Sequence, residues 1–183
     1  MATPSKEHCI LDLILNHSPL KEWHFEELAR ESRTSRAATA KWLKKHVATG
    51  LIRKVKEQGA FPHYTVGRGN PHYYARKRVH TLNQLHDSGL LAALLSSDAK
   101  TVILFGSIIK GDWYHDSDID IFILGAIRGF DKNAYEERLG RQIELHVFND
   151  RDEIRKVKSG LMKNVIDGYV LKGSVQDVAD IEP

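Results

Sequence analysis

The sequence predicts a two-domain chain of the α+β class, and three of its features lead to this prediction. Residues 1–66 show three helical patterns followed by two short strand-like runs, whereas residues 101–148 contain apolar runs typical of buried strands. Between them, residues 67–71 combine two glycines with asparagine and proline, which is typical of a linker. We therefore expect a first domain over 1–66, a linker and connecting helix over 67–89, and a small mixed sheet with flanking helices over 90–183.

The composition is that of a globular protein and excludes several other classes. With 183 residues, of which 42% are hydrophobic and 28% charged, the chain can bury a sizeable core and is neither collagen-like nor wholly disordered. No run of about 18 apolar residues occurs, and Lys6, Glu7 and Asp12 stand where a signal peptide would have its apolar core. The single cysteine, Cys9, cannot form an internal disulfide. We expect a cytoplasmic protein that does not contact a membrane.

Charge is distributed unevenly along the chain. Residues 1–86 carry 15 Lys and Arg against 7 Asp and Glu, whereas residues 87–183 carry 12 against 17. A basic first half is typical of a segment that meets a polyanion such as a nucleic acid. A solvated basic face without a partner is the alternative that charge alone leaves open. The acidic second half needs another explanation, and metal binding is one candidate.

Helical periodicity predicts three helices in the first domain. The first covers about residues 5–17, and its apolar positions are Ile10, Leu11, Leu13, Ile14 and Leu15. The second covers about 24–31. The polar residues 32–35 then form a turn and an N-cap for the third, which covers 36–49 and stops at Gly50. The third helix is expected to bury Ala37, Ala40, Leu43 and Val47 and to present Ala38, Lys41, Trp42 and Lys45 on its opposite face.

Two strand-like runs, 51–56 and 63–66, follow the third helix and predict a hairpin. Three helices and a hairpin resemble the winged helix-turn-helix, and the residues that carry the resemblance are Phe25–Arg30 and Lys41–Ile52. The resemblance implies that the third helix enters the major groove of DNA and that the hairpin touches the backbone. Lys41 and Lys45 would then face DNA, and the groups close to phosphates would be Arg33, Ser35, Lys54 and Lys56. Winged helices also dock proteins and often dimerise, so a protein partner and a homodimer stay open.

The elements after the linker lead to a buried strand. Helical patterns cover about 72–88 and 90–96, and Thr101–Phe105 is a continuous apolar run typical of a strand buried on both faces. This run ends abruptly at Gly106–Ser107. Later patterns predict a helix over 131–140, one terminal helix over 151–166 and a short strand over 169–171.

Two aspartates lie two residues apart in the next strand-like run, residues 116–124. Alternation in a strand would project the carboxylates of Asp118 and Asp120 from one face, while Ile119 and Ile121 anchor the other face in a core. Two like charges so close destabilise a sheet unless a cation neutralises them, and carboxylate oxygens favour Mg²⁺ or Mn²⁺. For such a pair alone, a polar strand edge without a metal is the commoner explanation.

A glycine-serine turn stands at a defined distance before the aspartates. Gly106–Ser107, ten intervening residues and Asp118–Ile119–Asp120 resemble the signature of the nucleotidyltransferase superfamily that includes DNA polymerase β, and more closely the minimal nucleotidyltransferases. The resemblance covers about residues 90–173. It implies that Gly106 lets the backbone approach the phosphates of an NTP and that Ser107 donates its hydroxyl to them. Asp118 and Asp120 would hold the metal ions.

The family also uses a third acidic residue on a later strand, and the run Gln142–Phe148 offers Glu144. This carboxylate would complete the metal site and help to deprotonate an attacking hydroxyl. Glu is less usual than Asp at this position, and a charge on the open face of a half-exposed strand is the alternative. His146 is not expected to be a ligand, because Mg²⁺ disfavours imidazole.

Three functional hypotheses follow. The first is a metal-dependent transfer of a nucleoside monophosphate, AMP if the resemblance holds, from an NTP to a hydroxyl of a protein or nucleic acid, as in antitoxins that adenylylate a partner toxin. It implies Mg²⁺ or Mn²⁺ as cofactor and ATP or another NTP as substrate. The second is a DNA-binding transcriptional regulator whose nucleotidyltransferase domain senses a nucleotide or is inactive. In the third, the basic half binds RNA and presents its 3′ end to the site.

Overall fold

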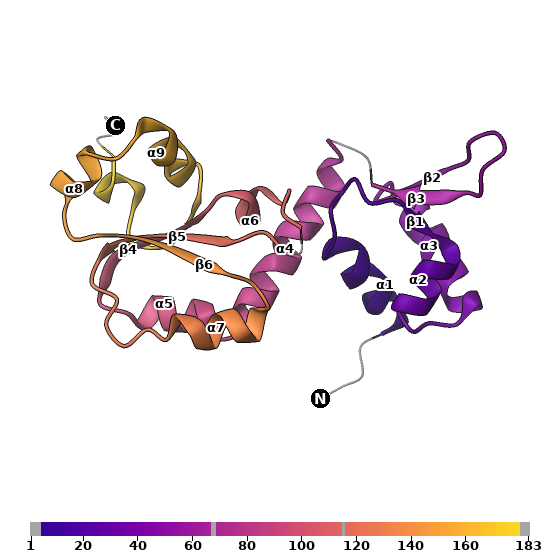
Figure 1. Cartoon of the computed structure of the whole chain (residues 1–183), viewed down its shortest axis with the longest axis horizontal. Helices are drawn as coiled ribbons and strands as arrows, with labels where there is room; N and C mark the ends of the chain where they lie inside the picture. The colour runs from indigo at the N-terminus through magenta and orange to yellow at the C-terminus, as the bar shows by residue number, and fades with distance from the viewer. Residues whose placement is uncertain (1–4, 67–68, 115, 180–183) are drawn as a thin grey trace. The chain divides into compact units, whose positions relative to one another are not determined.

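The computed structural model describes residues 5–66, 69–114 and 116–179, and the chain divides into two compact units, Met1–His80 and Thr81–Pro183 (Figure 1). Helix α4 (Pro71–Asp87) runs through the division between them. Residues 67 and 68 of the expected linker lie outside the described residues. Among the helices of the described part, none has the length and apolar content needed to cross a membrane.

Three helices form most of the first unit. They are α1 (Lys6–Leu15), α2 (Phe25–Glu31) and α3 (Arg36–Ala48), so the three predicted helices are confirmed, with small differences at their ends. The Ser5 hydroxyl caps α1 by accepting the N–H of His8 at 3.2 Å. The Ser35 hydroxyl caps α3 in the same way, because it accepts the N–H of Ala38 at 3.3 Å.

A small antiparallel sheet of order β1-β3-β2 completes this unit. Its strands are β1 (Trp23–His24), β2 (Arg53–Val55) and β3 (His63–Thr65). The predicted hairpin is confirmed as the pair β2–β3. Strand β1 was not expected, because two residues are too few to show a period, and only their pairing with β3 defines them as a strand.

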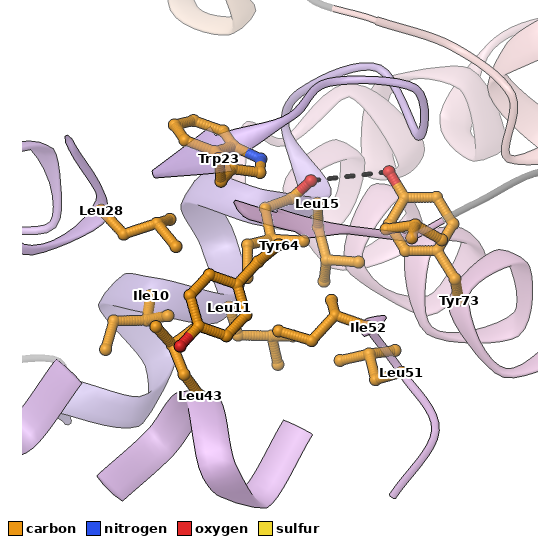
Figure 2. Packing of buried hydrophobic residues seen from close by; sticks show 12 residues of the cluster. Ile10, Leu11, Leu15, Trp23, Leu28, Leu43, Leu51, Ile52, Tyr64 and Tyr73 are labelled. Atoms are coloured by element: carbon orange, nitrogen blue, oxygen red, sulfur yellow. Dashed lines mark hydrogen bonds between the residues drawn. The ribbon is translucent and has the colours of Figure 1, made fainter. Parts of the chain in front are cut away.

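Apolar side chains from the three helices, from β1 and β3, and from Leu51 and Ile52 before β2 meet in one core, which Figure 2 shows from close by. Trp23, Leu28 and Leu43 are almost completely buried in it. Tyr73 of α4 is also buried, and its hydroxyl donates to the carbonyl of His17 at 3.1 Å and lies 3.5 Å from that of Ile14. This contact joins the start of α4 to the end of α1, so the first turns of α4 belong to the first unit.

The buried face of α3 differs from the expected stripe. The expected positions that are exposed are Ala37, Ala40 and Val47. Leu43 is buried as expected, and it shares the inward face with the polar residues Thr39 and His46. The Thr39 hydroxyl makes hydrogen bonds with the Thr34 hydroxyl at 2.7 Å and the Ser35 carbonyl at 3.1 Å. The buried Thr39 hydroxyl therefore has hydrogen-bond partners. Because the buried face of α3 includes polar residues, a search for an apolar stripe could not show which way the helix is rotated.

The second unit is built on a four-stranded sheet of order β6-β5-β4-β7. Strand β5 pairs in parallel with β6, and β4 pairs antiparallel with β5 and β7. Each of the four predicted strands is confirmed, and their bounds are β4 (Ala99–Phe105), β5 (Ile119–Gly125), β6 (Ile143–Phe148) and β7 (Tyr169–Lys172).

Helices cover both faces of this sheet, as Figure 1 shows. The end of α4, α5 (Leu90–Ser96) and α7 (Lys132–Leu139) cover the face that carries Val102 and Ile121. The opposite face, with Ile103 and Phe122, packs against α8 (Arg151–Arg155) and α9 (Ser159–Ile166). A single helical turn, α6 (Ser107–Lys110), follows β4, and a short 3₁₀ helix, η1 (Val175–Asp177), follows β7. The central strands are therefore buried on both sides, and this fixes their register.

The terminal helix predicted over 151–166 is wrong as a single element. The structure has two helices there, because the N–H groups of Lys156 and Val157 bond three residues back, to Glu153 at 3.2 Å and Ile154 at 3.0 Å. Such bonds tighten and end α8. The backbone is then extended at Lys158, which precedes the first turn of α9. Apolar periodicity continues across the break, so the sequence pattern does not reveal it.

The buried His46 makes the stability of the first unit depend on pH. His46 is 4% exposed. This burial lowers the pKa of its imidazole below the ordinary value of 6.5. Below that value the unfolded chain takes up a proton that the folded chain resists, so the stability present at neutral pH is lost on acidification. We expect wild type to lose more unfolding free energy than His46→Gln between about pH 7.5 and about pH 5.5 in urea titrations. The exposed His72→Gln should behave like wild type, and equal pH dependence in all three proteins would contradict a neutral buried His46.

Candidate functional site

The candidate site lies where β4 ends and β5 begins. Strand β4 ends at Phe105, the chain turns at Gly106 into α6, and residues 116–118 lie directly before β5. Phe105 is paired with Asp120, so the turn stands beside the first residues of β5. The parallel pairing of β5 with β6 adds a third strand at the same place. Three segments distant in sequence, the end of β4 with its turn, the start of β5 and the start of β6, thus meet at one end of these strands.

Register brings Asp120 and Glu144 together. In the parallel pair of β5 and β6, Asp120 stands opposite Glu144, so their side chains project from the same face. His146, two residues beyond Glu144, projects from that face as well. Its Nε2 lies 3.5 Å from Oε1 of Glu144 and 3.9 Å from Oδ1 of Asp120. One ligand atom from each of the three side chains lies within 4.8 Å of the other two.

The surroundings of Asp120 disfavour its negative charge. Partial burial raises the pKa of this carboxyl above its ordinary value, and the charges of Glu144 and Asp118 raise it further, whereas His146 acts in the opposite direction. Two carboxylates and a third nearby therefore repel each other at this edge. A divalent cation would relieve that repulsion.

Gly106 is required by the position of Asp120. Its backbone has φ of +73° and ψ of −155°, a region that in practice only glycine occupies. A Cβ on this residue would collide with Oδ2 of Asp120 and lie 3.0 Å from its Cγ. The backbone of the turn therefore forms a wall against which the carboxylate rests.

Asp118 is not part of this group, and the strand expected over 116–124 begins only at Ile119. The N–H of Ile119 donates to the Gln142 carbonyl at 2.9 Å. Asp118 precedes that first bond, lies in the loop and is exposed. Its charge still reaches Asp120, since it raises the pKa of that carboxyl. A strand pattern alone could not show where pairing starts.

Ser107 is half-buried and begins α6 directly after Gly106. Its carbonyl accepts the N–H of Gly111 at 2.9 Å, which closes this single turn. At the end of the turn, Lys110 donates to the side chain of Asn164 at 3.0 Å. The expected nucleotide-binding pair, Gly106 and Ser107, is thus held beside Asp120 by β4 and α6.

His146 was not expected to be a metal ligand, but the structure places it beside Asp120 and Glu144. Its side chain is 20% exposed, and its Nε2 is buried without a hydrogen bond from any described residue. The ring lies 5.2 Å from that of Phe105, between their centroids, which fixes its position on the sheet. The sequence did contain a sign of this placement. His146 follows Glu144 by two residues in a predicted strand, and this spacing puts both side chains on one face.

These three side chains fit a divalent cation. Ligand atoms about 2.1 Å from one ion lie up to about 4.2 Å apart, so closure around an ion needs only small side-chain movements. Two carboxylates match the charge of the ion, and the buried Nε2 gains a partner. The expected metal-ligating residues Asp120 and Glu144 are therefore together, with Asp118 within electrostatic reach.

The residues expected at DNA lie in the first unit and are all exposed; they are Arg33, Ser35, Lys41, Lys45, Lys54 and Lys56. Lys45 is engaged, because its Nζ lies 2.8 Å from Oε1 of Glu7. Ser35 has a structural role as the N-cap of α3. Arg33 is in the left-handed region with φ of +52°, in the turn between α2 and α3. Lys41, Lys54 and Lys56 remain as exposed cations of the third helix and the hairpin.

Comparison with known proteins gives one match in the second unit. Residues 92–174 match the family model described as "Polymerase beta, Nucleotidyltransferase", which is less than half of the chain but includes Gly106, Ser107, Asp120 and Glu144. No curated protein matches the chain. A solved structure described as "Crystal structure of the toxin-antitoxin with AMP-PNP" is 23% identical over 55% of this chain and 76% of its own, with a TM-score of 0.33. At that TM-score the likeness supports no conclusion about fold or function.

The contact between Gly106 and Asp120 can be tested by a double-mutant cycle on unfolding free energy. Gly106→Ala should destabilise the protein more than Gly129→Ala, because Gly129 also has positive φ but open space around it. Left-handed backbone alone costs about 1–2 kcal/mol. In an Asp120→Ala background the colliding atoms are gone, so part of the cost of Gly106→Ala should disappear. Equal costs in both backgrounds would show that the carboxylate does not rest on the turn.

Proposed function

We propose that the chain is a metal-dependent nucleotidyltransferase that moves a nucleoside monophosphate, AMP by preference, from an NTP to a hydroxyl of a macromolecular acceptor. The observation that carries the proposal is the juxtaposition of Asp120 and Glu144 beside the Gly106–Ser107 turn. The match of residues 92–174 to the nucleotidyltransferase family model supports it. Paired carboxylates next to a glycine turn suit a triphosphate and the divalent cation that accompanies it.

The side chains of the site have distinct roles in this proposal. Asp120 and Glu144 would hold one divalent cation, and Asp118 from the loop would serve the metal ion that accompanies the triphosphate. When bound, Mg²⁺ or Mn²⁺ supplies positive charge that offsets the charge of the triphosphate and polarises the α-phosphorus. Gly106 leaves room for phosphate at the backbone, and the Ser107 hydroxyl donates to a phosphate oxygen.

The transfer is a displacement at the α-phosphorus of the NTP. The oxygen of the acceptor hydroxyl forms a bond to this phosphorus, and the bond from it to the oxygen that bridges to the β-phosphate breaks. Pyrophosphate leaves with that electron pair. The proton of the hydroxyl passes to the Glu144 carboxylate, whose side chain is 59% exposed and thus accessible to an acceptor.

The acceptor we favour is a hydroxyl of a partner protein, as in the antitoxin-like members of the minimal nucleotidyltransferases that the Gly-Ser and Asp-x-Asp pattern resembles. A nucleic-acid hydroxyl is the other acceptor. The experiment below separates them because nuclease or protease treatment of the product removes the label from one class or the other.

Incubation with α-phosphate-labelled ATP, Mg²⁺ or Mn²⁺ and a cell lysate should label a macromolecule. Asp120→Asn and Glu144→Gln should reduce the initial rate at least about a hundredfold, because each removes a charged group at the reacting centre. Asp112→Asn is the matched control, since this exposed loop carboxylate lies outside the site, and it should keep the wild-type rate.

Label that comes from the γ-phosphate instead would contradict nucleotidyl transfer. Wild type that binds ATP but labels nothing, while it still binds DNA, would favour the alternative of a DNA-binding regulator with a nucleotide-sensing or inactive domain.

We further propose that the first unit binds DNA. The support is its order of elements, in which α2 and α3 are followed by the β2–β3 hairpin, as in the winged helix-turn-helix that the sequence resembles. Lys41 on α3 and Lys54 and Lys56 on and after β2 place exposed positive charge on the helix and on the hairpin. These groups would contact phosphates, and Lys45 would do so only after it leaves Glu7.

The salt dependence of duplex binding tests this assignment. Lys41→Ala and Lys54→Ala should each weaken binding and reduce the slope of log affinity against log salt by about 0.9, one phosphate contact each. Lys45→Ala should change the slope less, because Glu7 already neutralises it. Lys163→Ala on α9 is the control and should change neither. A structured RNA that binds more tightly than duplex, or unchanged slopes, would contradict the DNA assignment.

A further inference from the structure

We propose that His146 is a direct ligand of the divalent cation, together with Asp120 and Glu144, and that this nitrogen makes the site prefer first-row transition-metal cations to Mg²⁺. The inference rests on the proposed function, because it concerns the metal of that site. It names a residue outside the pattern of carboxylates that the sequence suggests, and it changes the class of cation that the site selects.

The surroundings of the His146 imidazole are the first argument. Nε2 of His146 is buried and has no hydrogen bond from a described residue, although two carboxylates face it. A charge-assisted hydrogen bond measures about 2.7–2.9 Å. The observed separations of 3.5 Å and 3.9 Å are longer than that. One ligand atom from each of the three groups lies within 4.8 Å of the other two, so the groups surround a common point.

Position is the second argument. Asp120 is fixed against Gly106, and β6 presents Glu144 and His146 on the same face with a spacing of two. His146 stands opposite Phe122 in the register, and its ring packs on Phe105. The imidazole is therefore held by the buried part of the sheet, as a ligand must be if it is to meet an ion without reordering.

Donor chemistry is the third argument. Two carboxylates balance the charge of a dication, and an imidazole adds a donor without adding charge. Mg²⁺ keeps oxygen ligands and water, whereas first-row transition-metal ions accept imidazole readily. Asp118 lies outside the three-residue group, so it stays available to a second ion that arrives with the nucleotide. The first ion should therefore bind in the absence of NTP.

The test uses the 183-residue chain without nucleotide. Mn²⁺ is titrated with electron paramagnetic resonance as the readout of free ion, and Mg²⁺ affinity is measured by competition. Wild type should bind Mn²⁺ more tightly than Mg²⁺ and show nitrogen coupling in the Mn²⁺ spectrum. His146→Gln should lose the nitrogen coupling and at least about tenfold in Mn²⁺ affinity, with a smaller loss for Mg²⁺.

Two matched variants separate the ligand from its surroundings. Asp118→Asn removes a neighbouring charge but no member of the group, so it should keep the nitrogen coupling. His86→Gln removes an exposed histidine of α4 and should leave both affinities unchanged. The coupling in wild type does not depend on any variant, so a folding defect in His146→Gln, visible in its unfolding midpoint, does not remove the test.

Absence of nitrogen coupling in wild type, or an unchanged ratio of Mn²⁺ to Mg²⁺ affinity in His146→Gln, would overturn the inference. Labelling of an acceptor with Mg²⁺ would in that case still support the proposed transferase. Nitrogen-coupled Mn²⁺ in a protein that transfers no label would uphold the ligand assignment and contradict the proposed function.

Discussion

The candidate site depends on one constraint, the parallel pairing of β5 with β6 in the register that sets Asp120 opposite Glu144. Strand β5 is buried by helices on each face, and a shift of one residue would turn its apolar side chains the wrong way. The apolar cores on the two faces therefore hold two carboxylates together that would otherwise separate. The free energy that opposes their repulsion comes from the burial of residues such as Ile121 and Phe122.

The turn after β4 is the second feature that positions Asp120. Gly106 has the backbone conformation and the lack of a side chain that let the chain pass directly beside Asp120. Oδ2 of Asp120 lies against the turn, whereas its Oδ1 lies 3.9 Å from Nε2 of His146. Asp118 remains in solvent before the strand begins. The site thus has two parts. Asp120, Glu144 and His146 are already together on the sheet, whereas Asp118 is exposed in the loop before it.

The first unit shows that formal charge and surface charge are different quantities. Lys77 counts toward the basic first half, but it is fully buried, and its Nζ donates to the His17 carbonyl at 2.7 Å and contacts the Tyr73 hydroxyl at 3.1 Å. Lys45 is paired with Glu7. The positive surface offered to a polyanion is therefore narrower than the sequence count, and it is concentrated on α3 and the hairpin.

The sequence by itself determined the strands, most helices, the core positions of Ile119 and Ile121 and the turn at Gly106, because burial periods and glycine turns are local properties. It did not determine the buried face of α3, where Thr39 and His46 replace apolar residues, or the break between α8 and α9. Only the tertiary structure decided that Asp118 lies outside the group and that His146 lies within it. The reason is physical: strand ends and cross-strand neighbours are set by hydrogen bonds between segments distant in sequence, such as that from Ile119 to Gln142.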